Sequence, residues 1–335
     1  IGDFNYSRHR APTRTRLETV LSALIHGPTL TYSSGVAAVH AYLIGLRPRR
    51  VAIGEGYHGS RQVIQLYASL TGCEILRYDE LDQLQAGDVI HLETPINPTG
   101  EAANIRYYAT EAHKHGAYLV VDATFGPPGL QDPFALGADV VVHSGTKYFG
   151  GHHDLLCGTL TVPPGRRDWF ATLCEQRTIL GSVLGSMEGW LGLRSLRTLE
   201  LRVCRQSENA TGLVRWLAGW LESEGDNVVK RTVDVVRHAS LQDEDMDWLK
   251  EQMPNGFGAV FAVEMKNEAM GRRLPGALRL LQHATILGGV ESQLEWRRLV
   301  DSTAKPTLLR FSIGVEHLDD LKADLLRGLE SVVDL

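Results

Sequence analysis

The sequence predicts an α/β protein in two parts: a large domain on a mostly parallel β-sheet and a smaller C-terminal α+β domain. Two observations favour this fold class. Short apolar runs alternate with helix-like stretches through the first half of the chain, which is the pattern of a parallel sheet covered by helices. A long helical stretch then precedes a separate set of strands and helices, which indicates a second domain.

The strands of the large domain are expected where apolar and β-branched residues cluster in short runs. These runs lie at residues 51–54, 74–78, 89–93, 118–122, 140–143 and 159–162. Helical patterns lie between several of them, at residues 37–46, 61–70 and 105–115. Ligands of such sheets bind beyond the carboxyl ends of the strands, so the residues that follow each strand are candidates for chemistry.

The second half is expected to begin with one long helix, from about residue 187 to residue 222, that links the two domains. Its apolar residues share one broad face: Trp190, Leu191, Leu193, Leu196 and Leu199. Strands at 260–265 and 308–313 and a closing helix at 318–332 predict the small domain. We therefore expect an N-terminal arm (1–18), a large domain that binds the ligand (19–195), and a linker helix with the small domain (196–335).

Composition narrows the class of protein. Of 335 residues, 43% are hydrophobic and 22% are charged, which is usual for a soluble globular protein. The net charge of −6 gives no support for nucleic-acid binding, and no apolar run reaches the roughly 18 residues of a membrane span. The polar, Arg-rich start is no signal peptide, and because it lacks Met we expect further residues upstream. The four cysteines form no CxxC pair, so we expect reduced thiols in a cytoplasmic protein.

Asp122 and Lys147 are the strongest candidates for chemistry. Alone, Asp122 would be a cap at the end of its strand, and Lys147, in a loop after the next strand, would be a solvated charge. Together they suggest another function, because a lysine amine condenses with an aldehyde cofactor as a Schiff base and a carboxylate keeps a pyridine nitrogen protonated. Ser144 and Thr146 flank the lysine with hydroxyls suited to holding a phosphate.

Two further segments fit the same cofactor. The run Ser33-Ser34-Gly35-Val36 precedes a helical pattern. It is an ordinary helix cap by itself, but a helix N-terminus with glycine also admits an anion closely. Tyr57 follows the strand at 51–54, where an aromatic ring either packs in the turn or stacks on a cofactor ring.

The motifs that carry these residues resemble one enzyme family. HSGTKYFGGHHDLLCG, at residues 143–158, is similar to the lysine signature of the Cys/Met-metabolism, or trans-sulfuration, enzymes, which depend on pyridoxal 5′-phosphate (PLP). That family includes cystathionine γ-synthase, γ-lyase and β-lyase. Similar motifs extend over nearly the whole chain: YSRHRAPTRTRLE at 6–18, ETPINPTG at 93–100, SLRTLELRV at 195–203, LGGVES at 287–292 and LRFSIGVE at 309–316. Several segments look closest to a fungal branch.

The resemblance implies an aspartate-aminotransferase-like fold (fold type I) and PLP as cofactor. It implies catalytic roles for Lys147, Asp122 and Tyr57, with Lys147 bound to the cofactor, Asp122 at the pyridine nitrogen and Tyr57 on the ring. The remaining roles that it implies are phosphate binding by Gly35, Val36, Ser144 and Thr146, and contact with a neighbouring subunit's phosphate by Tyr6 and Arg8. It also implies substrate binding by four residues: Asn97, Glu291, Ser292 and Arg310. It further implies a homo-oligomer with shared active sites, and we expect a dimer of dimers.

The resemblance also bears on the reaction. A Glu before the Ser of the LGG motif accompanies chemistry at Cγ in this family, and this chain has Glu291 before Ser292. We therefore expect γ-replacement or γ-elimination on a homoserine ester or cystathionine, with β-elimination as the alternative. Gln62 stands where the family often has Arg, and Ile286 where it commonly has Ser, so the family pattern leaves the substrate open.

Parts of the sequence are also compatible with two other classes of function. Ser144-Gly145-Thr146-Lys147 also satisfies S-x-x-K of the β-lactamases, but the K-T-G and S-D-N motifs of that class do not occur. The second class is a protein that binds PLP without catalysing a reaction. The presence of Lys147, Asp122 and Arg310 argues against it. A metal at His152, His153 and Asp154 is not expected, since adjacent residues rarely present two ligands to one ion.

Overall fold

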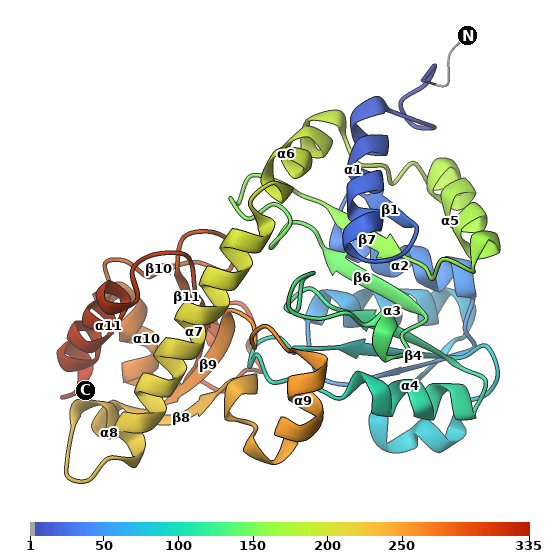
Figure 1. The fold of residues 1–335 in the computed structure, drawn as a ribbon. Helices are drawn as coiled ribbons and strands as arrows, with labels where there is room; N and C mark the ends of the chain where they lie inside the picture. Colours follow the sequence, from blue (N-terminus) through green and yellow to red (C-terminus); the bar gives the residue numbers. More distant parts are fainter. Residues whose placement is uncertain (1–3) are drawn as a thin grey trace.

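The computed structural model describes residues 4–335 and consists of two parts, each built on its own β-sheet (Figure 1). The first sheet has seven strands in the order β1-β7-β6-β5-β4-β2-β3. Its strands are β1 (Thr29–Tyr32), β2 (Arg50–Ile53), β3 (Glu74–Leu76), β4 (Val89–Glu93), β5 (Tyr118–Asp122), β6 (Val140–Ser144) and β7 (Gly158–Thr161). The strands from β6 to β3 are parallel, while β7 and β1 add two antiparallel pairings at one edge. The mostly parallel sheet expected from the sequence is confirmed.

Helices cover both faces of this sheet because its strands carry apolar residues on both sides. Along β5, Leu119 and Val121 face one apolar cluster and Val120 faces the other. The first cluster includes residues of α1 (Pro12–Leu24) and α4 (Ile105–Lys114), and the second includes residues of α2 (Gly35–Leu46), α3 (His58–Thr71) and α5 (Arg167–Leu180).

The C-terminal part is a five-stranded sheet in the order β10-β11-β12-β9-β8. Its strands are β8 (Val233–Arg237), β9 (Val260–Met265), β10 (Gln282–His283), β11 (Gln293–Trp296) and β12 (Leu308–Ser312). Its helices are α8 (Val228–Thr232), α9 (Met246–Gln252), α10 (Glu268–Ala277) and α11 (Leu318–Val332). The strands expected at 260–265 and 308–313 are confirmed as β9 and β12. The other three lack a continuous apolar run: β10 has two polar residues, β11 reads QLEW, and Asp234 interrupts the valines of β8.

The expected linker is two helices, α6 (Ser186–Leu196) and α7 (Leu199–Glu222), with a break between them. In Figure 1, α7 runs from α6 down the side of the C-terminal sheet. Arg202 stabilises the break, because its guanidinium donates to the carbonyl oxygens of Ser195 and Tyr148 and to the Thr198 hydroxyl. A hydrophobic pattern does not report such an interruption, since the apolar face continues through it.

The carboxyl ends of three neighbouring strands bring polar side chains together. Glu93, Asp122 and Ser144 are the last residues of β4, β5 and β6, which lie side by side in the sheet. Glu93 and Asp122 are direct partners in the register of β4 and β5. This edge is where a parallel sheet of this kind binds its ligand. No helix within residues 4–335 combines the length and apolar character needed to cross a membrane.

Candidate active site

A cavity of about 530 Å³ lies at this edge of the large sheet. Its wall includes the carboxyl ends of β5 and β6, the N-terminus of α2, and residues of β11 and β12 from the other sheet. Most of the residues expected at the site line it: Gly35, Val36, Tyr57, Asn97, Asp122, Ser144, Thr146, Lys147 and Arg310. The fold therefore collects into one cavity residues that are up to 275 positions apart in the chain.

Lys147 reaches the cavity from the tight loop that follows β6. The loop is held by the Lys147 amide, which donates to the Ser144 carbonyl at 3.1 Å, and by the Thr146 hydroxyl, which bonds both backbone groups of Cys157. Burial lowers the pKa of the Lys147 amine to about 8, and the nearby Arg310 guanidinium acts in the same direction. A larger fraction of this amine is thus uncharged near neutral pH than of an ordinary lysine.

Asp122 is held in one orientation by Thr124. The Thr124 amide and hydroxyl donate to one carboxylate oxygen of Asp122 at 3.0 and 2.6 Å. The same hydroxyl accepts a hydrogen bond from the Ser144 amide at 2.8 Å, which ties the ends of β5 and β6 together. Burial raises the pKa of Asp122, and a cation placed beside it would oppose that rise.

Glu93 connects the residues on either side of it. Its two carboxylate oxygens accept hydrogen bonds from the backbone amides of Tyr57, at 2.7 Å, and Asn97, at 2.8 Å. Burial raises the pKa of Glu93 to about 8, and the adjacent Asp122 adds to the rise. The sequence motif contained Glu93, but only the structure shows that it holds the backbone of two residues of the cavity wall.

The N-terminus of α2 opens into the cavity at Gly35. The Ser34 side chain caps the helix by accepting from the Ala37 amide at 3.2 Å. A Cβ atom at Gly35 would lie 3.0 Å from the Cβ and 3.2 Å from the Cα of Ser144. Glycine therefore keeps the helix N-terminus and the serine close together, with free amides and the positive end of the helix dipole directed at one place.

Arg310 lines the cavity from β12, a strand of the C-terminal sheet. Its guanidinium donates to Asn97 Oδ1 at 3.3 Å and to the Thr285 carbonyl oxygen at 2.6 Å, and its Nη2 lies 2.9 Å from Glu295 Oε2. Its side chain is only 4% exposed, so these contacts hold the planar fork in place within the cavity. Asn97 and Arg310, both expected at the substrate carboxylate, are thus in contact.

Four expected site residues do not line the cavity. The Ser292 hydroxyl donates to Glu316 at 2.7 Å and is fully buried, and Glu291 is half exposed beside His153. Tyr6 and Arg8 lie in the N-terminal arm, where Arg8 donates to the Thr178 carbonyl oxygen at 2.8 Å. Within one chain, therefore, the structure does not bring these four residues to the remainder of the site.

Sequence reasoning missed several residues of the wall. From the sequence, no role was expected for four polar residues in or near the motifs: Glu93, Thr124, Glu295 and Arg297. Their position at or close to the end of a strand is the sequence feature that could have identified them. Within residues 4–335, no group of three or more His, Cys, Asp or Glu side chains is placed to hold a metal ion.

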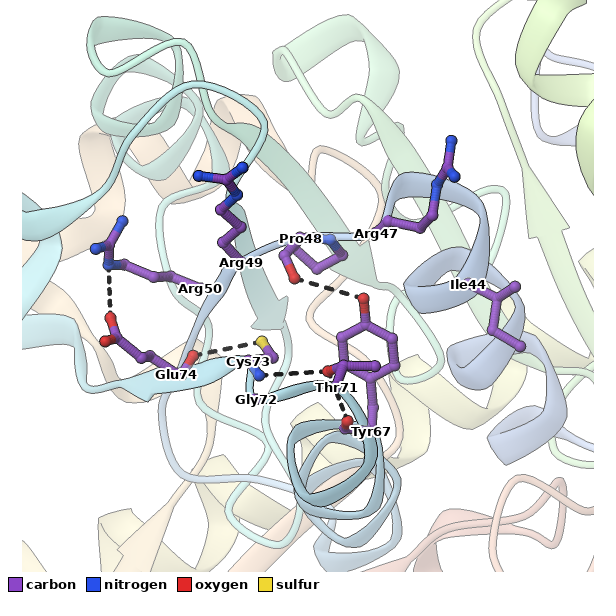
Figure 2. A pocket seen from close by; sticks show the side chains of 10 residues that line it. All are labelled: Ile44, Arg47, Pro48, Arg49, Arg50, Tyr67, Thr71, Gly72, Cys73 and Glu74. Carbon is purple, nitrogen blue, oxygen red and sulfur yellow. Dashed lines mark hydrogen bonds and ion pairs between the residues drawn. The ribbon is translucent and has the colours of Figure 1, made fainter.

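A second hollow lies at the other end of α2 and α3 (Figure 2). Its wall includes Arg47, Arg49 and Arg50, and Arg50 is paired with Glu74 at 2.7 Å. A helix of 12 residues is about 18 Å long, so α2 separates this hollow from Lys147. Unlike the first cavity, this hollow is lined by no lysine and by no buried pair of carboxylates.

The first cavity suits an aldehyde cofactor that carries a pyridine ring and a phosphate. Lys147 supplies a buried amine of lowered pKa, and Asp122 an oriented carboxylate. The close approach of Gly35 to Ser144 leaves a helix N-terminus free for an anion. An amine, a carboxylate and an anion site of this kind are the groups that would hold PLP.

Comparison with known proteins agrees with this chemistry. The chain is 34% identical to a putative cystathionine gamma-lyase of Streptomyces coelicolor, with 99% of this chain and 85% of that protein covered. It is 32% identical to cystathionine beta-lyase MetC of Bacillus subtilis, with coverage of 99% and 87%. The crystal structure of cystathionine gamma synthase from Xanthomonas oryzae pv. oryzae in complex with aminoacrylate and cysteine superposes with a TM-score of 0.89 at 28% identity, covering 100% of this chain and 89% of that one. Residues 1–330 match the family model described as Cys/Met metabolism PLP-dependent enzyme, and the chain belongs to that family.

Proposed function

We propose that this enzyme catalyses γ-elimination or γ-replacement on a homoserine ester or a cystathionine-type amino acid. The observation that carries the proposal is one cavity whose wall holds Asp122, Arg310 and a buried amine of lowered pKa, that of Lys147. PLP, when bound, supplies an aldehyde that condenses with amines and a ring that accepts the electron pair of a broken Cα–H bond.

The residues of the chain would perform the remaining steps. Lys147 would hold the cofactor and then, as a free amine, take the proton from Cα and return it to Cγ or its leaving group. Asp122 would keep the pyridine nitrogen protonated, since a buried carboxylate stabilises a neighbouring cation. Arg310 would bind the substrate α-carboxylate with two parallel hydrogen bonds, while Asn97 supports its fork.

Tyr57 would stack on the cofactor ring and serve as a second proton donor. The support is its place in the cavity wall and the hydrogen bond that fixes its backbone to Glu93. Gly35, Val36, Ser144 and Thr146 would bind the phosphate. Loss of the leaving group at Cγ also needs a proton removed from Cβ, and Lys147 would take that proton once it has released the Cα proton.

β-Elimination is the second candidate, and one specific finding favours it: similarity to a named cystathionine beta-lyase at 32% identity. The preference for γ-chemistry depends on the family pattern at Glu291 and Ser292, neither of which lines the cavity. Product analysis therefore has to separate the two.

The test is mass spectrometry of the products from O-acetylhomoserine, cystathionine and cysteine, each with and without an added thiol. Release of 2-oxobutanoate, or transfer of the thiol to Cγ, supports the proposal. Pyruvate from cystathionine would instead establish β-elimination. If none of the three substrates reacts with the PLP-loaded enzyme, the proposal is overturned.

We further propose that the enzyme is a cytoplasmic homotetramer, a dimer of dimers, in which Tyr6 and Arg8 reach the phosphate in a neighbouring subunit. Their place outside the cavity of their own chain supports this. The division at residues 18 and 195 also remains a proposal; α1 runs across residue 18, and α6 ends at Leu196. The likeness to a fungal branch likewise remains a prediction.

A further inference from the structure

Three charged side chains form a cluster on the wall of the cavity that belongs to the C-terminal part. Glu295 and Arg310 are direct partners in the register of β11 and β12. Glu295 Oε2 lies 2.9 Å from Arg310 Nη2 and accepts a hydrogen bond of 2.7 Å from Arg297 Nη1. All three side chains are at least nine-tenths buried, so one carboxylate is shared by two guanidinium groups and the cluster carries one excess positive charge.

Arg297 has donors that the protein does not use. A guanidinium offers five N–H groups in a fixed fork. The Nε of Arg297 is buried and has no hydrogen-bond partner within residues 4–335. Glu295 accepts the single side-chain hydrogen bond that Arg297 donates among these residues. Since buried donors are usually satisfied, this fork indicates an acceptor that the polypeptide does not supply.

The other cations of the cavity wall already have roles. Lys147 serves the cofactor and Arg310 the α-carboxylate in the function proposed above. Of the lysines and arginines that line the cavity, Arg297 has no role in the proposed function. The same wall also contains apolar side chains: Leu156, Ile286 and Val300. A cation beside apolar surface is suited to an extended side chain that ends in an anion.

We propose that Arg297 binds a carboxylate at the far end of the substrate's side chain, so that the enzyme prefers amino acids whose leaving group is anionic. This inference deepens the proposed function and rests on it for the position of the α-carboxylate at Arg310. A substrate whose two carboxylates bind Arg310 and Arg297 would be held at both of its ends. Such binding at two ends fixes the orientation of the reacting bonds.

Arg297 has a rival role, which is to hold Glu295 and thereby orient Arg310. The two roles differ in what they predict. A positioning residue affects every amino-acid substrate alike because each presents the same α-carboxylate to Arg310. A residue that binds the distal carboxylate affects those substrates that have one.

A matched pair of substrates separates the two roles. O-Succinylhomoserine and O-acetylhomoserine are both O-acyl esters of homoserine, and the distal carboxylate is present in the first alone. Arg297→Gln should lower kcat/KM for the succinyl ester by about 10- to 100-fold, the usual loss for a hydrogen bond to a charged group. It should change kcat/KM for the acetyl ester by about 2-fold or less. Arg297→Lys should recover part of the loss, because it keeps the charge without the fork.

Arg298→Gln is the control variant. Arg298 lies on the same 3-10 turn, η5 (Arg297–Leu299), is exposed, and donates to the Ala304 carbonyl oxygen rather than lining the cavity. It should leave both esters unaffected. An equal loss for the two esters in Arg297→Gln would overturn the proposal and assign Arg297 to the positioning of Arg310.

A binding measurement tests the role of Arg297 without relying on catalytic turnover. L-2-Aminoadipate and L-norleucine have side chains of equal carbon count and no leaving group, and binding of either should change the visible absorbance of the PLP-loaded enzyme. Wild-type enzyme should bind 2-aminoadipate more tightly, and Arg297→Gln should abolish the preference. If the preference holds but neither ester reacts, the proposed reaction fails and the role of Arg297 stands. If wild-type enzyme shows no preference, the role of Arg297 fails.

Discussion

Lys147 shows how the surroundings of one residue change its chemistry. The loop after β6 buries the amine, and burial lowers its pKa to about 8 because the charged form loses its hydration. Arg310 acts in the same direction and Glu295 opposes it. An uncharged amine is the form that attacks an aldehyde, so the cavity favours the reactive form.

The rate at which PLP is taken up by the cofactor-free enzyme should follow this pKa. Protonated amine predominates below pH 8 and is unreactive, so the rate should rise through a midpoint near pH 8 rather than near the 10.5 of an ordinary lysine. Stopped-flow absorbance of the protein-bound cofactor measures it between pH 6.5 and 9.5. Lys147→Ala should show no covalent band at any pH; a persistent wild-type band would remove Lys147 from this role.

Asp122→Asn should leave PLP bound but slow the removal of the Cα proton. A neutral amide does not stabilise a protonated pyridine, whose pKa would fall by about 1–3 units and whose protonated fraction would fall by about 10- to 1,000-fold. Exchange of the Cα proton for deuterium, followed by NMR with a non-reacting amino acid, measures the step directly. Exchange at the wild-type rate would contradict the assignment.

Arg310→Lys should weaken substrate binding and leave the cofactor in place. Lysine keeps the positive charge but loses the planar fork that binds a carboxylate through two hydrogen bonds. We expect KM to rise by about 10-fold or more, since a buried pair of this kind is worth about 2–5 kcal/mol when one side is removed. Steady-state kinetics and a PLP titration together check this. Loss of PLP with unchanged KM would move Arg310 to the cofactor.

At the scale of elements, the N-terminus of α2 and the carboxyl ends of β4, β5 and β6 meet at one place. The helix contributes free amides, and the strands contribute Glu93, Asp122 and Ser144. Thr124 links two strand ends by donating to Asp122 and accepting from the Ser144 amide. The geometry of the site thus depends on the packing of α2 against β6 as much as on any single side chain.

Gly35→Ala should lower PLP affinity by about 10-fold. A Cβ at this position would lie 3.0 Å from Ser144 Cβ and 3.2 Å from its Cα, so either the helix or the strand end must shift. Overpacking of this kind costs about 1–3 kcal/mol. Fluorescence titration with PLP measures the affinity.

Gly219→Ala in α7 is the matched control. Its Cβ would meet no atom within 4 Å, so the substitution should raise the free energy of unfolding by up to about 1 kcal/mol through helix propensity and leave PLP affinity unchanged. Equal behaviour of the two variants in both measurements would show that the contact between Gly35 and Ser144 is unimportant.

At the scale of the whole molecule, we expect the arm before α1 to contact a neighbouring subunit. Tyr6 is 57% exposed, and the Arg8 guanidinium lies 5.3 Å from the Tyr6 ring centre, away from the cavity of its own chain. An exposed aromatic ring with an arginine beside it is suited to contact with another subunit.

Arg8→Ala should therefore weaken PLP retention in a homo-oligomer without changing the fold of the subunit. Analytical ultracentrifugation gives the oligomeric state, and dialysis followed by absorbance gives the retained PLP. Arg10→Ala, an exposed arginine of the same arm, serves as the control. A monomer that retains PLP tightly, or an Arg8→Ala protein with unchanged retention, would contradict the shared site.

Local patterns in the sequence determined the fold class and the centre of the site. Each signal is local: Asp122 ends the apolar strand at 118–122, and Lys147 lies three residues after the strand that ends at Ser144. Such patterns predicted both the sheet and the edge where ligands bind. The family motifs added Arg310 and Asn97, which the fold brings within 3.3 Å of each other.

Tertiary structure alone decided the contacts between segments distant in the chain. The register of β11 and β12 places Glu295 beside Arg310, that of β4 and β5 places Glu93 beside Asp122, and Ser292 is turned to Glu316 and away from the cavity. The break between α6 and α7 likewise depends on Arg202 reaching the carbonyl oxygens of Ser195 and Tyr148. Strand register and side-chain partners follow from packing over the whole domain, so no local pattern of apolar and polar residues contains them.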